Sequence, residues 1–284
     1  MQNWVLPLIG NMLVSAVDTA AILRVLEQPV DDGTFWSRRT TLADRLRGLT
    51  KDVLDWAKVR GYRDGPNPAE WGGNLKQVLP AKSKVSPVVN MPAMAYADLP
   101  AFMVDLRARP ALAARALEFT ILTASRTGEV IGAQWSEIDL DKAVWTVPAD
   151  RMKMGKEHRV PLSRPAVALL RALPREKGNP FVFIGAATGK PLSNMAMATL
   201  LQRRMGRSDI TVHGFRSTFR DWAEECSSYG GSIAEAALAH AVGDKIEAAY
   251  RRGDLFEKRR RLMNAWATYC STSGSNVVRL QAAQ

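Results

Sequence analysis

Apolar residues in the first eighty positions recur at intervals of three and four, which predicts helices. Asp18 is placed to cap a first helix, and Thr41 is placed to cap a longer one that Gly61 ends. An earlier apolar run, 4–10, is interrupted by a proline and follows no basic segment, so we interpret it as core rather than as a signal peptide. Residues 1–82 are therefore predicted to form a small helical domain.

The pattern changes between positions 80 and 92, where three prolines and two lysines stand with little periodicity. We interpret 83–92 as a linker. Beyond it, the segments 143–147 and 159–162 are predicted to be strands of a β-hairpin with a long polar tip. Helical spacing predicts helices over 98–109, 111–125, 165–173, 193–205, 214–225 and 232–241, and from 245 to the C-terminus with breaks. The predicted fold is mainly α with a small antiparallel β-sheet, and residues 93–284 form the second domain.

The charge of the chain indicates which kind of partner it binds. The net charge is +11 over 284 residues, and the sequence pI is about 9.9, so a polyanion is the first partner to expect. The two cysteines, Cys226 and Cys270, stand in no CxxC pair and the three histidines are scattered, which argues against a zinc site and fits a reducing cytoplasm. No apolar run is long enough to span a bilayer, so no membrane partner is expected.

Cleaving a DNA phosphodiester without a metal sets clear requirements. Cations must stabilise the charge that spreads over the phosphate oxygens, and the planar fork of arginine suits this task. A nucleophile must lose a proton, and the departing sugar oxygen must gain one. No metal and no cofactor is then required.

The sequence offers a cation for each side of such a phosphate. Arg126 follows an apolar helix, with Glu129 placed to buttress its guanidinium, and His213 and Arg216 stand one helical turn apart at the start of another helix. His240 ends a third helix. Each residue also has an ordinary explanation, since Arg126 and His240 could satisfy carbonyls at helix ends and a lone histidine is usually a core residue.

Tyr250 and Lys153 complete the set. Tyr250 follows His240 by ten residues and precedes two arginines, which makes a wholly buried position less expected for it. Lys153 lies at the tip of the predicted hairpin, where Lys156 is the alternative. We prefer Lys153, although a polar turn often carries solvated lysines.

These residues, in this order, resemble the active sites of tyrosine recombinases. Arg126, Lys153, His213-x-x-Arg216, His240 and Tyr250 stand as in phage integrases, and the surrounding stretches are similar to integrases of satellite phages and genomic islands. The resemblance covers nearly the whole chain. It implies that residues 1–82 are a SAM-like core-binding domain and that 93–284 are the catalytic domain.

The resemblance also implies a role for each residue. Tyr250 would attack the scissile phosphate and form a 3′-phosphotyrosine. Arg126 and Arg216 would bind the non-bridging oxygens, and Lys153 would protonate the leaving 5′ oxygen. His213 would accept or hold the tyrosine proton, and His240 would hydrogen-bond the phosphate.

The implied function is site-specific recombination that integrates or excises a mobile element. Its partners would be double-stranded attachment sites, gripped by the two domains as a clamp, three further protomers in a tetramer, and an accessory DNA-bending or directionality protein, all in the cytoplasm at the nucleoid. Two alternatives remain open, a type IB topoisomerase-like nicking-closing enzyme and a catalytically idle DNA-binding remnant. Because the chain opens at Met1, close to the core-binding region, we also expect that an arm-binding domain and part of the core-binding domain are missing.

Overall fold

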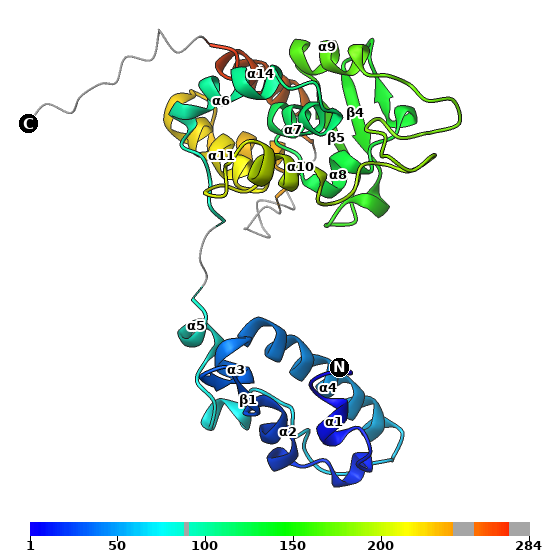
Figure 1. The fold of residues 1–284 in the computed structure, drawn as a ribbon, viewed down its shortest axis with the longest axis vertical. Helices are drawn as coiled ribbons and strands as arrows, with labels where there is room; N and C mark the ends of the chain where they lie inside the picture. The colour runs from blue at the N-terminus through cyan, green and yellow to red at the C-terminus, as the bar shows by residue number, and fades with distance from the viewer. Residues whose placement is uncertain (88–90, 241–252, 273–284) are drawn as a thin grey trace, which may run out of the picture. The chain divides into compact units, whose positions relative to one another are not determined.

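The computed structural model describes residues 1–87, 91–240 and 253–272, and its contacts divide the chain into two compact units. The first unit is Met1–Asn90 and the second is Met91–Gln284. Each unit has its own hydrophobic core, and the backbone of each can be followed in Figure 1.

The first unit is built from short helices around one long helix. Its elements are α1 Leu6–Ile9, α2 Thr19–Leu26, β1 Pro29–Val30, β2 Gly33–Thr34, α3 Phe35–Arg38, α4 Thr40–Val59 and α5 Lys82–Val85, with 3-10 turns at Val14–Ala16 and Leu75–Gln77. The carboxylate of Asp18 accepts a hydrogen bond from the Ala21 amide at 2.8 Å, which confirms the predicted cap of α2. The short α5 overlaps the start of the predicted linker, 83–92.

The prediction that Thr41 caps the long helix is wrong. The helix α4 begins at Thr40, and its flanking residue is Arg39, which makes no side-chain capping bond. The capping side chain lies earlier, because Thr34 accepts from the Ser37 amide at 3.2 Å to start α3. The chain then runs from α3 into α4 with a single residue between them. Gly61, at φ +72°, follows the end of α4 as predicted.

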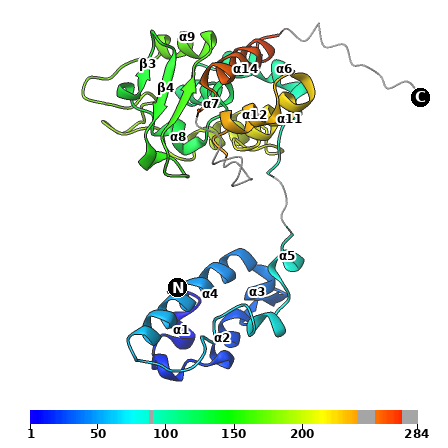
Figure 2. The ribbon, with the colours of Figure 1, turned by 180° about the vertical axis from the view of Figure 1, so that it is seen from behind.

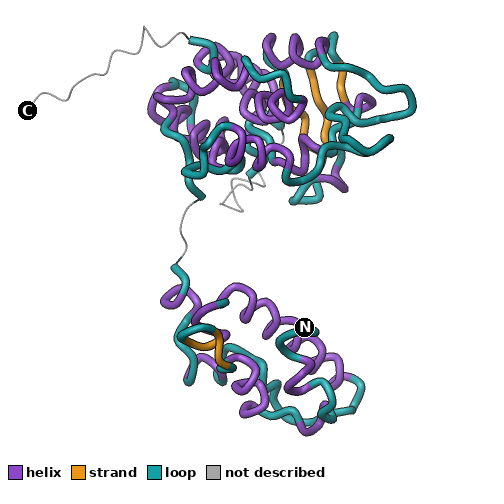
Figure 3. The backbone as a smooth tube through the Cα atoms, in the orientation of Figure 1, coloured by secondary structure: helices purple, strands orange, loops and turns teal. Residues whose placement is uncertain are grey.

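The second unit is mainly helical with one small sheet, as predicted (Figure 3). Its elements are α6 Leu99–Arg107, α7 Leu112–Thr123, α8 Thr127–Ile131, β3 Ile138–Asp139, β4 Val144–Val147, β5 His158–Pro161, α9 Arg164–Ala172, α10 Ala196–Thr199, α11 Gly214–Cys226, α12 Gly231–Ala237 and α14 Phe256–Tyr269, with 3-10 turns at Tyr96–Asp98, Trp135–Glu137 and Ala149–Arg151.

The predicted hairpin is confirmed. β4 and β5 pair antiparallel, with Val144 opposite Pro161 and Val147 opposite His158. Strand β3 adds to the free edge of β4 and was not predicted. The predicted helix 193–205 is only partly right, because α10 gives way to a π-helix at Leu200–Arg204.

Helix α7 lies at the centre of the second core, and Figure 2 shows it behind α14 and beside the sheet. Phe119 of α7 packs against Trp145 of β4, with ring centroids 5.4 Å apart. On the α14 side, the indole nitrogen of Trp266 donates to the Ile121 carbonyl at 2.8 Å. The end of α7 is thereby fixed from two sides. These contacts also fix where the residues after α7 begin.

In the described residues, no helix has the length and apolar character that crossing a bilayer requires.

Candidate active site

Arg126 lies at the start of α8, where Glu129 holds it. One oxygen of the Glu129 carboxylate accepts from the Arg126 amide at 2.8 Å, and the other accepts from Nη1 at 2.8 Å. The Glu129 side chain is 6% exposed and that of Arg126 is 21% exposed. The buried carboxylate thus fixes the backbone and the guanidinium together, and part of the guanidinium faces solvent.

Arg216 is the most enclosed cation of the group. The residue is 4% exposed and lies in the first turn of α11. Its Nη1 donates to the Ala124 carbonyl, and its Nη2 donates to the Leu238 carbonyl at 2.6 Å. Burial, followed by the charge of Arg126, lowers the pKa of Arg216 to about 10, so the group remains charged at neutral pH. Its Nε is buried and has no hydrogen-bond partner among the described residues.

Two left-handed turns supply the carbonyls that hold these arginines. Ala124, at φ +50°, ends α7, and Ala239, at φ +49°, follows α12. The Ala239 carbonyl accepts from Nη2 of Arg126 at 3.4 Å. A helix end leaves carbonyls without partners inside the helix, and here arginine side chains satisfy three of them. Alanine rarely adopts this conformation, so each turn stores strain beside the site.

The end of α12 brings His240 into the same group. Its Nε2 lies 3.1 Å from Nη2 of Arg216, and its Nδ1 lies 2.6 Å from a carboxylate oxygen of Glu235. Glu235 is also bound by Nε of Arg220 at 2.7 Å. The structure therefore places His240 and Arg216 in direct contact.

His213 precedes α11 and is exposed. Thr211 accepts from the Gly214 amide at 3.0 Å, and Gly214 packs so closely on the Pro92 carbonyl that a side chain would collide with it. The pKa of His213 is lowered by burial first and then by electrostatic interaction with Arg216, Arg126, His240 and Lys153. These four side chains act on His213 because they lie around one region of the unit.

Lys153 lies beyond β4, in the turn that precedes β5, and its side chain is exposed. Met152 beside it is buried, at 6% exposed. The effect of Lys153 on the pKa of His213 links it to the group. Lys156 is exposed in the same turn. The choice of Lys153 over Lys156 is supported by that link and stays a prediction.

Tyr250 falls outside the described residues, so its position is not part of the geometry. The chain is described again from Gly253. Asp254 there forms ion pairs with Arg159 at 3.2 Å and with Arg259 at 3.1 Å. Arg259, 1% exposed, also donates to the Arg159 carbonyl at 2.6 Å. These bonds tie the start of α14 to strand β5.

Three residues of the site were not assigned to it from the sequence. Glu235 contacts His240, Arg259 ties α14 to β5, and His158 lies near Arg126 and Glu129. Burial, followed by the charge of Arg259, lowers the pKa of His158 to about 4, so it is neutral at pH 7. For Glu235, the sequence held one signal of a contact, which is its spacing from His240 across a helix end.

The arrangement can bind an anion. Three groups, Arg126, Arg216 and His240, meet where α7, α11 and α12 begin or end, with His213 and Lys153 near them. The Arg126 side chain is 21% exposed and pairs with one carboxylate, so its charge is accessible to an anion. Within the described part of the chain, no cluster of histidines, cysteines and carboxylates has the makings of a metal site.

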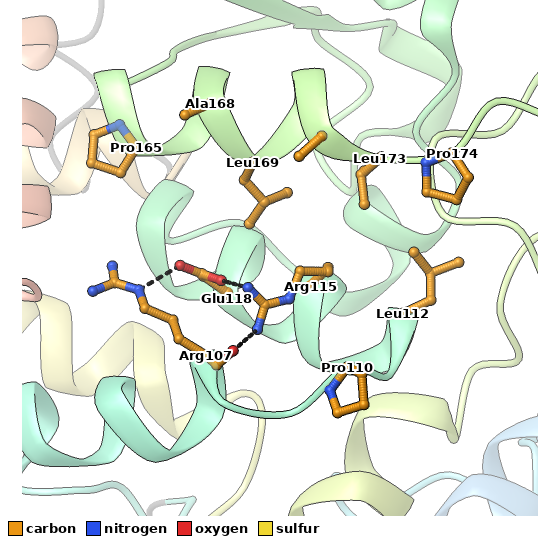
Figure 4. A pocket seen from close by; sticks show the side chains of 11 residues that line it. Arg107, Pro110, Leu112, Arg115, Glu118, Pro165, Ala168, Leu169, Leu173 and Pro174 are labelled. Carbon is orange, nitrogen blue, oxygen red and sulfur yellow. Dashed lines mark hydrogen bonds and ion pairs between the residues drawn. The ribbon is translucent and has the colours of Figure 1, made fainter.

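A separate cavity of about 590 Å³ lies between α6, α7 and α9 (Figure 4). Glu118 is held there between Arg107 at 2.6 Å and Arg115 at 2.7 Å. The carboxylate is 7% exposed on its side chain, and both arginines face it. We interpret this triad as a structural link between the end of α6 and the middle of α7, because each charge has a partner.

Comparison with known proteins gives consistent matches for both units. The phage integrase family matches residues 94–251, and the phage integrase central domain matches residues 1–74. Among curated relatives, the prophage integrase IntA of Escherichia coli K12 is 29% identical over 98% of this chain and 65% of its own length. The prophage integrase IntZ of the same strain is 38% identical over 94% and 63%, respectively. The chain thus spans slightly less than two thirds of these relatives.

Solved structures show the same fold. A lambda integrase dimer bound to a COC′ core site is similar with a TM-score of 0.57 and 18% identity, covering 86% of this chain and 82% of that one. The Tn1549 transposon integrase in complex with circular intermediate DNA is similar with a TM-score of 0.53 and 13% identity, covering 86% and 88%.

Proposed function

We propose that this chain, which belongs to the phage integrase family, is a site-specific DNA recombinase that cuts and rejoins DNA through a covalent bond to Tyr250. One observation carries the proposal. Arg126 and Arg216, which stand ninety residues apart in the sequence, converge with His240 on the turn that follows α12.

The chemistry follows from the needs of a phosphoryl transfer. The Tyr250 oxygen forms a bond to phosphorus while the bond from phosphorus to the 5′ oxygen breaks, which leaves a 3′-phosphotyrosine and a free 5′-hydroxyl. Arg126 and Arg216 stabilise the charge on the non-bridging oxygens. His213, whose pKa is lowered, is neutral at pH 7 and able to accept the tyrosine proton. Lys153 protonates the leaving oxygen, and His240, whose Nε2 contacts Arg216, holds that guanidinium in place beside the phosphate.

Rejoining is the same reaction in reverse. The energy of the phosphodiester is kept in the phosphotyrosine bond, so resealing needs no ATP. A 5′-hydroxyl from another strand attacks the phosphotyrosine and releases Tyr250, which exchanges strands between two sites.

The partner we propose is double-stranded DNA bearing attachment sites. Support comes from the net charge of +11 and from the lambda integrase structures, which are described as a dimer on a core site and a tetramer on a Holliday junction. We propose that this chain also acts as a tetramer on DNA, with both units contacting the duplex, and that an accessory protein bends the DNA or sets the direction of the reaction.

A nicked suicide substrate tests the proposal. In a candidate attachment-site duplex with a nick near the cut, the released short strand diffuses away and the covalent adduct accumulates. We expect an adduct on a denaturing gel from the wild-type chain. Tyr250→Phe removes the attacking oxygen, so it should form none while binding the duplex as the wild type does.

Tyr229→Phe is the matched control, because Tyr229 lies in the same unit and its hydroxyl has no part in the proposed chemistry. It should form the adduct normally. An idle DNA-binding remnant would give no adduct from any variant. A nicking-closing enzyme would give the adduct and relax supercoils, yet would exchange no strands between two sites.

A further inference from the structure

The Glu235 carboxylate bridges two side chains that come from different elements. One oxygen lies 2.6 Å from Nδ1 of His240, and the other lies 2.7 Å from Nε of Arg220. The hydrogen bonds from Arg220 and His240 outweigh the effect of burial, so the pKa of Glu235 is lowered. Glu235 is therefore ionised at neutral pH, and it can only accept hydrogen bonds.

The backbone explains why Glu235 and His240 meet. The His240 amide donates to the Glu235 carbonyl at 3.0 Å, and the Ala239 amide donates to the Ala236 carbonyl at 3.2 Å, with Ala239 in the left-handed conformation. These features define a Schellman turn. Its six-residue ring places the residue after the turn beside the last turn of the helix, so the two side chains start from adjoining positions.

The contacts of His240 also determine where its proton lies. Arginine donates hydrogen bonds and accepts none. Nε2 of His240, 3.1 Å from Nη2 of Arg216, must then be the acceptor in the neutral ring. The proton of the neutral ring is therefore on Nδ1, which donates to Glu235. Glu235 and Arg216 thus specify the same tautomer from opposite sides of the ring.

The bonds form a closed circuit. Arg216 and Arg220 stand four residues apart on α11 and so lie on the same face of it. Arg216 contacts His240, His240 contacts Glu235, and Glu235 contacts Arg220. The circuit joins the first half of α11 to the end of α12 through side chains alone.

We propose that Glu235 is a positioning residue for cleavage, which orients His240 and, through it, the guanidinium of Arg216. Glu235 does not touch the DNA in this proposal. Arg220 holds the Glu235 carboxylate in turn, in the way that partners outside the first contact layer orient functional histidines. The inference rests on the proposed recombinase function. It assigns Glu235 an effect through His240 and Arg216 without contact with the phosphate.

The first test reads the tautomer without any reaction. The chain has three histidines, so ring nitrogen signals in a 15N NMR spectrum can be assigned with one His240→Asn sample. In the wild-type chain we expect neutral His240 to carry its proton on Nδ1. In Glu235→Gln the amide can donate to Nδ1 as well as accept from it, so only Arg216 still requires the proton on Nδ1, and a smaller share of that tautomer is expected. A wild-type proton on Nε2, or an unchanged spectrum in Glu235→Gln, would overturn the proposal.

The second test measures adduct formation on the nicked duplex. Loss of a carboxylate that orients a metal-bound histidine typically costs about 10- to 100-fold, and we expect Glu235→Gln to slow adduct formation by a factor of that order. DNA binding should not weaken, because the substitution removes a negative charge. The Glu235 side chain is 35% exposed, so glutamine should be accommodated, and circular dichroism checks the fold.

Glu224→Gln is the matched control. It removes one exposed carboxylate from α11, the helix that carries Arg216 and Arg220, and it does not touch His240. Its adduct rate should equal that of the wild type. The double variant Glu235→Gln/His240→Ala identifies the route. If Glu235 acts through His240, the double variant forms the adduct no more slowly than His240→Ala does. A double variant whose rate falls by the product of the two single-variant factors would contradict this route. Should the wild type form no adduct, the proposed function fails, and the tautomer measurement still decides this inference.

Discussion

At the scale of single residues, the site uses its cations for two purposes at once. Arg216 satisfies the carbonyls of Ala124 and Leu238 while it presents its charge to the site. Arg126 does the same for Ala239 at one end and pairs with Glu129 at the other. Because buried carbonyls need donors, these arginines are part of the framework without any bound anion.

The assignment of the general acid makes a prediction about one atom of the substrate. Lys153→Ala should slow adduct formation by about 100-fold or more, the range for general acid catalysis, because the leaving 5′ oxygen then lacks a proton donor. A duplex with sulfur in place of that oxygen should restore the rate, since a thiolate leaves without protonation. Adduct formation on paired oxygen and sulfur substrates measures this.

Lys156→Ala is the matched control from the same turn. It should cleave both substrates at the wild-type rate. If Lys156→Ala is the variant that sulfur rescues, the general acid is Lys156, and if sulfur rescues neither variant, the acid lies elsewhere.

At the scale of elements, the site is assembled from helix ends. α7 ends at Ala124, α8 begins after Arg126, α11 begins after His213 and α12 ends before His240. The interiors of these helices pack in the core, whereas their ends have unpaired amides and carbonyls that side chains complete. A site built in this way depends on the geometry of its turns more than on the helices themselves.

The strain at one of these turns can be measured. Ala239→Gly removes a Cβ that the left-handed conformation disfavours by about 1–2 kcal/mol, against a loss of about 0.5–1 kcal/mol from the greater freedom of glycine in the unfolded chain. We expect the free energy of unfolding to rise by about 0.5–1 kcal/mol. Urea unfolding followed by circular dichroism provides the measurement.

The control with the opposite sign lies two residues earlier. Ala237 is helical and buried, so Ala237→Gly should lower the free energy of unfolding by about 1 kcal/mol. A fall in stability for Ala239→Gly as well would mean that the turn at position 239 is not left-handed.

Local pattern predicted the elements that have a strong local signal. The β4–β5 hairpin and the helix from Gly214 follow from spacing and turn residues. The two-residue strand β3 has too few positions to show a period, and a π-helix at Leu200–Arg204 has nearly the same apolar spacing as an α-helix over five residues.

The same reason explains which site residues could be predicted. Arg126, His213, Arg216 and His240 each stand in a recognisable local setting, and the structure gathers them. Glu235 could not be assigned, because its contact with His240 depends on a left-handed alanine that the residue type does not suggest. His158 could not either, because its neighbours come from α8, α12 and α14, which are distant from it in the sequence.

At the scale of the whole molecule, the two units have separate hydrophobic cores. The first core is formed by residues between Val5 and Leu79, and the second by residues between Met94 and Cys270. All the candidate catalytic residues that the structure describes lie in the second unit. Its stability therefore governs whether the site exists.

That stability should depend on pH through His158. The unfolded residue takes up a proton near its ordinary pKa of 6.5, whereas the folded one does so only at about 4. As pH falls across this window, the unfolded state binds protons that the folded state excludes, so stability present above 6.5 is lost. The loss attributable to His158 is at most about 3 kcal/mol.

Urea unfolding of the wild type and of His158→Gln between pH 7 and pH 4 measures this contribution. The variant should lose less free energy of unfolding across the window, because it has no ring to protonate. Parallel curves for the two chains would show that His158 is accessible to protons in the folded state.

If the chain carries out the proposed reaction, the carbonyl bonds of Arg126 and Arg216 have a consequence for the order of events on DNA. An arginine side chain held only by its substrate would lose its orientation when that substrate departs, and the orientation would have to form again for the next step. Here backbone carbonyls keep both guanidinium groups in place whether or not an anion is bound. Both guanidinium groups are therefore in position when a new strand end reaches the site, so the rejoining step needs no rearrangement of them.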